Sequence, residues 1–311
     1  MRGNTAADEG IDAGLIRNSV DFGTGIHAIA GFGPPGKTFR RAMTEIAECG
    51  FRHLMLLCWE GGPAVDAEGD APEAFINILA SDLDRFRQTV AGHGLRVSAI
   101  YPGFGLFDLS DEGIEGTIER LLEYRRIAWQ LGTNLMIHPN GPAEDPDAPH
   151  RDKRERIERL THVMDAVSSD EPGRLFKMAS DVHYRATVQT VEDCEYLLSC
   201  ARNRNTGLCL NMGHQATCGQ PGWELLERHP ERIHVLAWKD HLLGPDLPQP
   251  VFSVELGKGE TPFRKYLEVY RRVRCDALNI IAFEDVPFEE KKEALARSRQ
   301  YLENLFAQEG A

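Results

Sequence analysis

The sequence predicts a single (β/α)8 barrel, the TIM-barrel fold, on three observations. Eight short apolar runs alternate with amphipathic stretches along the 311 residues, which is the pattern of β-α units around a parallel sheet. The composition does not change along the chain in a way that would divide it into two domains. The glycine-rich phosphate fingerprint of a dinucleotide-binding sheet is missing, which favours a closed barrel over a doubly wound sheet.

The order of the elements follows from hydrophobic periodicity. In the stretch 79–93, for example, Leu83, Phe86 and Val90 share one face at helical spacing. The predicted strands are 25–31, 51–58, 95–101, 133–138, 175–180, 207–212, 232–238 and 278–284. The predicted helices are 37–49, 79–93, 116–131, 150–169, 190–202, 222–229, 262–274 and 288–307. Residues 1–20 are predicted to be a mobile tail, and the barrel is expected to occupy 21–311.

The composition argues against several classes of protein. With 42% hydrophobic and 27% charged residues, the chain is unlike a disordered one. The net charge of -13 argues against a nucleic-acid partner. The sequence contains no run of about 18 apolar residues, so no membrane span is predicted. No signal peptide is visible. Seven cysteines without a CxxC pair favour a reducing, cytoplasmic location.

The chemistry of such a barrel comes from side chains at the carboxyl ends of its strands. A strand end that faces solvent is polar in any case, but here the polar groups are mostly His, Asp, Glu and Lys, which indicates a functional site. An aromatic residue such as Trp59 suits either the apolar face of a sugar ring or packing at the rim. The candidates are His27, Trp59, Glu60, Tyr101, His138, Asp181, His183, Asn211, His214, Lys239, Asp240, His241 and Glu284.

Several motifs, in this order, resemble one family of barrels. They are FKMASDVHY at 176–184, LCLNMGHQATCG at 208–219, IHVLAWKDH at 233–241, FSVELGKGETPFRKYLEVY at 252–270 and LNIIAFED at 278–285. From about residue 24 to residue 307 the chain resembles the sugar-phosphate isomerase/epimerase superfamily of xylose-isomerase-like barrels. Its members include ketose epimerases, inosose dehydratases and hydroxypyruvate isomerases.

The resemblance implies a divalent metal, commonly Mn, Mg or Co, held by acids on the fifth, sixth and eighth strands and a histidine on the seventh. The residues that would hold it here are Asp181, Asn211, His214 and Glu284. This sequence departs from the family pattern, because Asn211 stands where an acid is expected and Ala237 where the histidine is expected. The ligands would therefore carry less charge, so a metal site and a metal-free site both remain open.

The resemblance implies an enzyme that abstracts a proton next to the carbonyl of a sugar or cyclitol. Asp181, Glu284, His183 and Lys239 are the predicted catalytic residues, with Lys239 as the electrophile if no metal is bound. An ion pair with Asp240 or Glu284 is the alternative role for Lys239. The residues predicted to bind substrate are His27, Trp59, Glu60, Tyr101, His138 and His214.

The expected reaction is isomerisation or epimerisation. A lyase or dehydratase reaction at the same site is the first alternative. The second is a non-catalytic binding or partner subunit in a homo- or hetero-oligomer.

Overall fold

A computed structural model describes residues 20–31, 36–103, 108–141, 152–244, 247 and 251–308. The tail predicted over 1–20 lies outside these residues except for Val20, which packs against the core. None of the helices in these ranges has the length and apolar character needed to span a bilayer.

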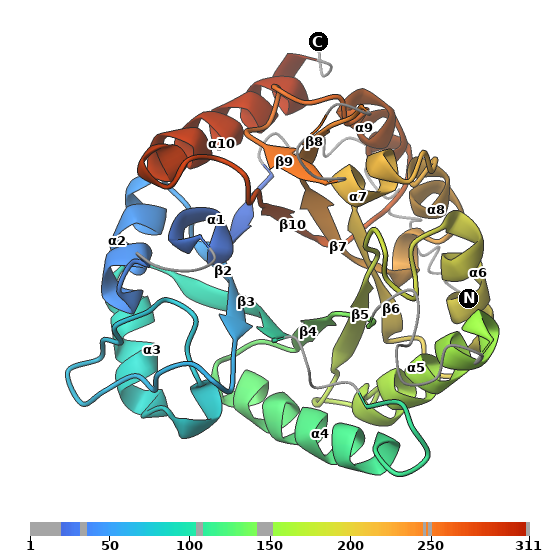
Figure 1. Ribbon diagram of the computed structural model, residues 1–311, viewed down its shortest axis with the longest axis horizontal. Helices are drawn as coiled ribbons and strands as arrows, with labels where there is room; N and C mark the ends of the chain where they lie inside the picture. The colour runs from blue at the N-terminus through green and yellow to red at the C-terminus, as the bar shows by residue number, and fades with distance from the viewer. Residues whose placement is uncertain are drawn as a thin grey trace, which may run out of the picture.

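Eight parallel strands close into a barrel, which confirms the predicted fold class (Figure 1). The strands are β1 (Gly23–Gly25), β2 (His53–Cys58), β3 (Arg96–Pro102), β4 (Leu135–His138), β5 (Lys177–Asp181), β6 (Thr206–Asn211), β7 (Ile233–Trp238) and β10 (Leu278–Ile281). They neighbour one another in chain order, and β1 pairs with both β2 and β10 to close the ring. All eight carboxyl ends therefore meet at one rim.

Helices form the outer layer, and each predicted helix is found with its ends shifted by a few residues (Figure 1). Side-chain caps fix several of their starts: Thr38 accepts from the backbone N–H of Arg41, and Thr190 forms a capping box with Asp193. The helices are α2 (Phe39–Glu48), α3 (Leu83–Gly92), α4 (Ile114–Gln130), α5 (Lys153–Val167), α6 (Val191–Cys200), α8 (Trp223–Arg228), α9 (Phe263–Arg272) and α10 (Lys291–Gln308). Short 3-10 turns lie at η1 (Ile78–Ala80), η2 (Pro230–Arg232) and η3 (Phe288–Glu290).

Four further elements follow strands at the carboxyl-end rim, where the sequence did not predict them. They are α1 (His27–Ala30), α7 (Met212–Thr217) and the antiparallel pair β8 (Asp240–Leu242) and β9 (Phe252–Val254). The prediction of a strand over 25–31 was wrong, because only Gly23–Gly25 pairs with its neighbours and the chain then turns into α1. All four residues of α1 are buried, and a short buried helix is as apolar as a buried strand.

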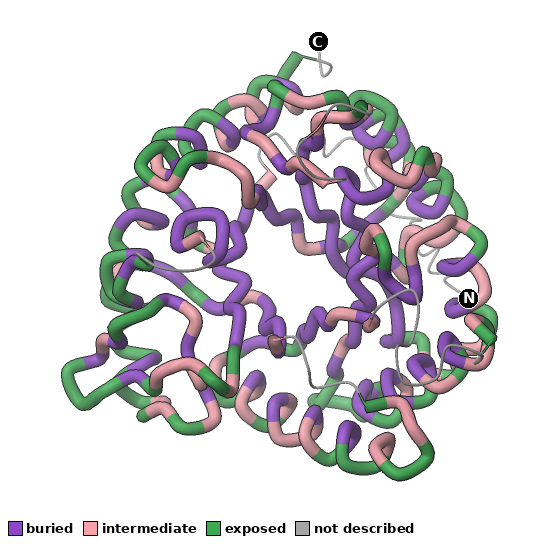
Figure 2. The backbone as a smooth tube through the Cα atoms, viewed as in Figure 1, coloured by how far each residue is buried: buried purple, intermediate pink, exposed green. Residues whose placement is uncertain are grey.

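The core consists of the strands and the inward faces of the helices (Figure 2). Trp238, Tyr124, Phe39 and Phe176 are among the largest fully buried side chains. Side chains alternate between the two faces of each strand, so one set fills the barrel and the other packs against the helices. This alternation decides which strand-end residues reach the centre of the rim.

Close packing around β6 gives a stability prediction. A methyl group on Gly207 would collide with the carbonyl oxygen of Arg232 and the imidazole of His234, whereas one on Gly116 of α4 would meet no atom within 4 Å. We expect Gly207→Ala to lower the free energy of unfolding by about 1–3 kcal/mol. The matched control Gly116→Ala should raise it by up to about 1 kcal/mol, since glycine is a poor helix former. Urea unfolding checks both, and equal effects of the two variants would contradict the described packing.

Candidate active site

A cavity of about 70 Å³ opens among the carboxyl ends of the barrel strands. Apolar side chains form its floor, and carboxylate, imidazole, amide and ammonium groups surround them. The lining residues are His27, Met55, Leu57, Tyr101, Ile137, Asp181, His183, Cys209, Asn211, Ala237, Lys239, Ile280, Ala282 and Glu284. Seven of the predicted site residues are among them: His27, Tyr101, Asp181, His183, Asn211, Lys239 and Glu284.

Strand register explains which residues line the cavity. Asp181 lies beside Cys209, and Asn211 lies beside Ala237, in neighbouring strands. Because every second residue faces inward, Lys239 follows Ala237 onto the same side. The same alternation along the last unit of the barrel brings Ile280, Ala282 and Glu284 to the cavity.

An ion pair between buried Lys239 and partly buried Glu284 lies at one side of the cavity. The Lys239 Nζ donates to Glu284 Oε1 at 2.8 Å, and His27 Nε2 lies 3.2 Å from the same oxygen. Lys239 is 5% exposed. The partner of Lys239 is therefore Glu284, and Asp240 has another role.

The ion pair fixes the charge of its carboxylate. Burial alone would raise the pKa of Glu284, but the charge of Lys239 and the hydrogen bond with His27 outweigh burial and lower the pKa well below its ordinary value. Burial lowers the pKa of His27 although Glu284 opposes the change. At neutral pH the site therefore holds an ionised Glu284 and a neutral His27.

Asp181 is the centre of a second cluster. The Tyr101 hydroxyl donates to Asp181 Oδ2 at 3.2 Å, and the Asn211 side-chain amide donates to Asp181 Oδ1 at 3.3 Å. Burial, and then the charge of Asp181, raise the pKa of Tyr101 well above its ordinary value, so the phenol keeps its proton. Both clusters face the same cavity.

Three histidine rings contact one another beside Lys239. The ring centroids of His183 and His214 are 3.5 Å apart, and those of His214 and His241 are 4.7 Å apart. His214 Nε2 lies 3.5 Å from the Lys239 Nζ. Burial, and then the charges of His183, Lys239 and His241, lower the pKa of His214 well below its ordinary value. His214 is therefore neutral and supports Lys239 from behind the cavity.

Of these rings, His183 is the one that lines the cavity. Its Nδ1 lies 2.8 Å from the carbonyl oxygen of Tyr184. A carbonyl only accepts hydrogen bonds, so Nδ1 is the donor of this bond, and in a ring with a single proton Nε2 is then the nitrogen without one.

Asp240 organises the backbone instead of the cavity. Its carboxylate accepts hydrogen bonds from the backbone N–H groups of Gly257, Gly259 and Thr261. The adjacent His241 bonds Thr217 through Nδ1 at 2.8 Å. Of the Lys-Asp pair in the sequence motif, Lys239 thus lines the cavity, and Asp240 holds the turn that follows β9.

Besides His214, three predicted substrate-binding residues lie away from the cavity lining. Glu60 forms an ion pair with Arg120 of α4 at 2.6 Å. Trp59 is 53% exposed on the rim. His138 is fully buried and bonds the Pro139 carbonyl, because the inward position of β4 belongs to its neighbour, residue 137.

Sequence reasoning did not select Lys291, which nevertheless touches the site. Its Nζ donates to the backbone oxygen of Glu284 at 2.9 Å, and the residue is 3% exposed. A lysine in an amphipathic helix ordinarily indicates a solvated face, so no sequence pattern separates it from exposed lysines. Cys209 also lines the cavity, where burial raises the pKa of its thiol well above the ordinary value. It is therefore not poised as a nucleophile.

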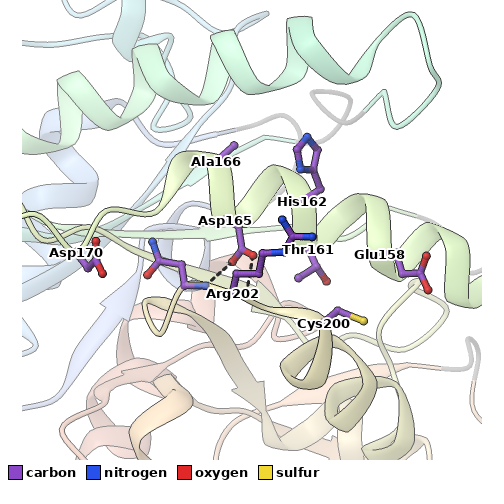
Figure 3. Close-up of a pocket in the computed structure, with 9 residues that line it drawn as sticks. Glu158, Thr161, His162, Asp165, Ala166, Asp170, Cys200 and Arg202 are labelled. Carbon is purple, nitrogen blue, oxygen red and sulfur yellow. Dashed lines mark hydrogen bonds between the residues drawn. The ribbon is translucent and has the colours of Figure 1, made fainter.

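A larger cavity of about 690 Å³ lies at the opposite rim, between α5 and the segment that precedes β6 (Figure 3). There the Asp165 carboxylate accepts the backbone N–H groups of Arg202 and Asn203 at 2.8 and 3.2 Å. These bonds hold a loop at the amino ends of the strands, the face that serves stability in such barrels. The site chemistry therefore belongs to the smaller cavity.

The residues around the smaller cavity do not fit a resident divalent cation. Within the described ranges, no three His, Cys, Asp or Glu side chains are grouped so as to hold one. Glu284 is already bonded to the Lys239 ammonium, and His214 faces the same ammonium. A divalent cation on these ligands would be repelled by the ammonium at contact distance, at a cost on the order of several kcal/mol.

The fold and the cavity define the class as a TIM barrel with ionisable side chains around a cavity at its strand ends. A family model of the xylose isomerase-like TIM barrel matches residues 43–305. The chain belongs to this family, which confirms the resemblance inferred from the motifs. A comparison with curated proteins gives no match.

Solved structures share the fold at low sequence identity. A sugar phosphate isomerase/epimerase from Parabacteroides distasonis is 13% identical, with a TM-score of 0.63, over 96% of this chain and 98% of that chain. A xylose isomerase-like TIM barrel protein from Mycobacterium smegmatis in complex with magnesium is 14% identical, with a TM-score of 0.67, over 92% and 96%. The probable 3-DHS dehydratase involved in petrobactin synthesis from Bacillus anthracis is 13% identical, with a TM-score of 0.64, over 91% and 98%.

The ion pair predicts a pH-dependent stability difference. Because the pKa of Glu284 is lower in the folded protein, its carboxylate stabilises the fold above the ordinary glutamate value of 4.5, and this stability is lost as the pH falls through the folded pKa. Glu284→Gln leaves Lys239 unpaired and should cost on the order of 3 kcal/mol at neutral pH. The gap should close in acid, where the wild-type carboxyl is also neutral.

Chemical unfolding of both proteins across a pH series measures this gap. The control is Glu224→Gln, which breaks an exposed pair with Arg228 at 3.3 Å and should cost less than about 1 kcal/mol. A Glu284→Gln effect that is independent of pH would argue against the ion pair as its cause.

The poor fit to a metal predicts the outcome of a metal titration. Millimolar Mn²⁺, Mg²⁺ or Zn²⁺ should leave the melting temperature of the wild type unchanged. In the double variant Lys239→Ala/Asn211→Asp the ammonium is gone and a third carboxylate is present, so a bound ion should stabilise it by about 2.7 kcal/mol at 100 times its Kd. Lys239→Ala alone is the control, and stabilisation of the wild type would show that a metal does fit.

Proposed function

We propose that the protein is an enzyme that removes a proton from the carbon next to the carbonyl of a small sugar or cyclitol. The observation that carries this proposal is that the Lys239–Glu284 pair and Asp181 share one cavity. A base and a fixed positive charge on one small ligand are what enediolate chemistry requires.

Lys239 supplies the positive charge. Its ammonium has three N–H donors, and its acceptors in the described part of the chain are Glu284 and His214. The third donor is left for the carbonyl oxygen of the substrate. As the proton leaves carbon, negative charge grows on that oxygen, and a preorganised ammonium above an apolar floor stabilises it strongly.

Asp181 is the base. It takes the proton from carbon, and the C–H electron pair becomes the carbon–carbon double bond of the enediolate. Tyr101 and Asn211 hold the carboxylate in position. Glu284, with its lowered pKa, is a weak base, and its role is to keep Lys239 charged and oriented.

His183 carries protons between oxygens of the ligand or back to carbon, since its Nε2 is the unprotonated nitrogen. Return of the proton to the neighbouring carbon gives isomerisation, return to the opposite face gives epimerisation, and loss of a β-hydroxyl gives dehydration. The three outcomes share the first step. The similarity to an isomerase/epimerase and to a probable dehydratase supports that step without selecting an outcome.

The non-catalytic alternative, a binding or partner subunit, is less well supported. A site that only binds a neutral polyol gains nothing from a buried ammonium and two carboxylates, which are unfavourable to desolvate. The retention of Lys239, Glu284 and Asp181 around one cavity therefore favours catalysis.

Deuterium incorporation tests the shared step. Purified protein is incubated in D2O with a panel of ketoses and keto-cyclitols, and NMR detects exchange at the carbon next to the carbonyl. We expect exchange with at least one compound, and EDTA should not abolish it. Asp181→Asn and Lys239→Met should each slow exchange by about 10²–10⁴-fold.

Lys258→Met is the matched control, because Lys258 carries an exposed ion pair with Glu255. Circular dichroism establishes that each variant is folded. Exchange that proceeds equally in Lys239→Met would overturn the role of the ammonium. A complete absence of exchange across the panel would overturn the proposed function.

A further inference from the structure

The amide of Asn211 has one hydrogen-bonding atom that the folded chain does not use. Asn211 is 3% exposed, and its Nδ2 donates to Asp181 at 3.3 Å. Its Oδ1 has no hydrogen-bond partner among the described residues. Buried acceptors without a partner are few in native proteins, and each one requires an explanation.

The orientation of this amide is dictated by its neighbour. Rotating the side chain by half a turn would place Oδ1 against a carboxylate oxygen of Asp181, and two acceptors would then repel each other. The hydrogen bond to Asp181 therefore keeps Nδ2 toward that carboxyl and leaves Oδ1 as the unused atom. The unused acceptor is thus a consequence of the neighbouring Asp181.

A donor without an acceptor lies on the next strand. Asn211 of β6 is in register with Ala237 of β7, and Lys239 follows two residues later on the same face. Among the described residues, at most two of the three Lys239 N–H groups have acceptors, in Glu284 and His214. The cavity lining thus offers one unused acceptor and one unused donor from adjacent strands.

We propose that Asn211 is a specificity-determining residue whose side-chain oxygen accepts a hydrogen bond from a hydroxyl next to the substrate's carbonyl. An α-hydroxy carbonyl compound presents a carbonyl oxygen for Lys239 and, on the adjacent carbon, a hydroxyl donor for Asn211. The site therefore selects α-hydroxy ketones and aldehydes over ketones that lack this hydroxyl. This inference rests on the proposed function, because it assigns the carbonyl of the substrate to Lys239.

The acceptor also separates this site from one that carries an acid at the same position. A carboxylate would accept a hydroxyl as well, but it would add a negative charge beside Asp181 where the enediolate forms. The amide gives the same recognition without that charge. The asparagine is thereby explained as an uncharged acceptor instead of a weakened metal ligand.

The experiment compares hydroxyacetone with acetone, which differ by one hydroxyl next to the carbonyl. Binding is followed by saturation-transfer NMR and catalysis by deuterium exchange in D2O. Sites built to bond a hydroxyl reject the analogue that lacks it, so wild type should prefer hydroxyacetone by about 100-fold or more. In the isosteric Asn211→Leu the preference should fall below about tenfold, because the acceptor is lost.

A second variant keeps the test independent of the hydrogen bond to Asp181. Asn211→Asp retains an acceptor but loses the donor, so the preference for hydroxyacetone should persist while the rate falls. Asn304→Leu applies the same substitution to an exposed residue of α10 and should leave the preference unchanged. If Asn211→Leu does not fold, Asn211→Asp still tests the inference, since loss of the preference there would contradict it.

The outcomes separate this inference from the proposed function. Lys239-dependent exchange with the same preference in wild type and Asn211→Leu would overturn the role of Asn211 and leave the function standing. Preferential binding of hydroxyacetone without any exchange would support the recognition and count against catalysis. A wild type that binds hydroxyacetone no better than acetone overturns the inference whatever its activity.

Discussion

The ion pair between Lys239 and Glu284 is the interaction on which the rest of the site depends. Lys239 is buried and Glu284 is partly buried, so neither charge would be favourable there alone, and at 2.8 Å each compensates the other. The carboxylate in turn bonds His27, and its backbone oxygen takes the buried ammonium of Lys291. Two elements far apart in the chain, β1 with its following helix and the segment after β10, are thereby tied at one point of the rim.

The alternation of side chains along each barrel strand decides which residues make up the site. Because side chains alternate along a strand, one residue of each neighbouring pair enters the cavity and the other packs outward. Lys239 enters while Asp240 binds three backbone N–H groups, and Ile137 enters while His138 is buried behind it. Whether a strand-end residue lines the cavity therefore depends less on its type than on whether its position in the strand faces inward or outward.

This rule marks how far the sequence could predict the molecule. Alternating apolar runs and amphipathic stretches were enough for the fold, and the positions of Asp181, Lys239 and Glu284 at strand ends followed from it. The same reasoning selects Glu60 and His138, which do not line the cavity. Glu60 is held by an ion pair with Arg120, and His138 points to the outer face of its strand, because its neighbour Ile137 points inward. Lys291 could not be found, because a charged residue on a helix is ordinarily solvated and only tertiary packing buries it.

In the proposed reaction the Lys239 ammonium, and not a divalent ion, supplies the positive charge at the enediolate oxygen. A single positive charge stabilises an enediolate less than a double charge in the same medium. The difference narrows when the charge lies in a small cavity with an apolar floor, where water does not screen it and no reorganisation is needed as the reaction proceeds. Lys239 meets both conditions, since Glu284 and His214 fix its direction and Met55, Leu57 and Ile280 line the floor. The uncharged Asn211, at a position where the family pattern has an acid, then has a physical explanation. A third carboxylate would weaken the positive charge of Lys239, whereas in the proposed reaction an amide recognises the hydroxyl and leaves that charge intact.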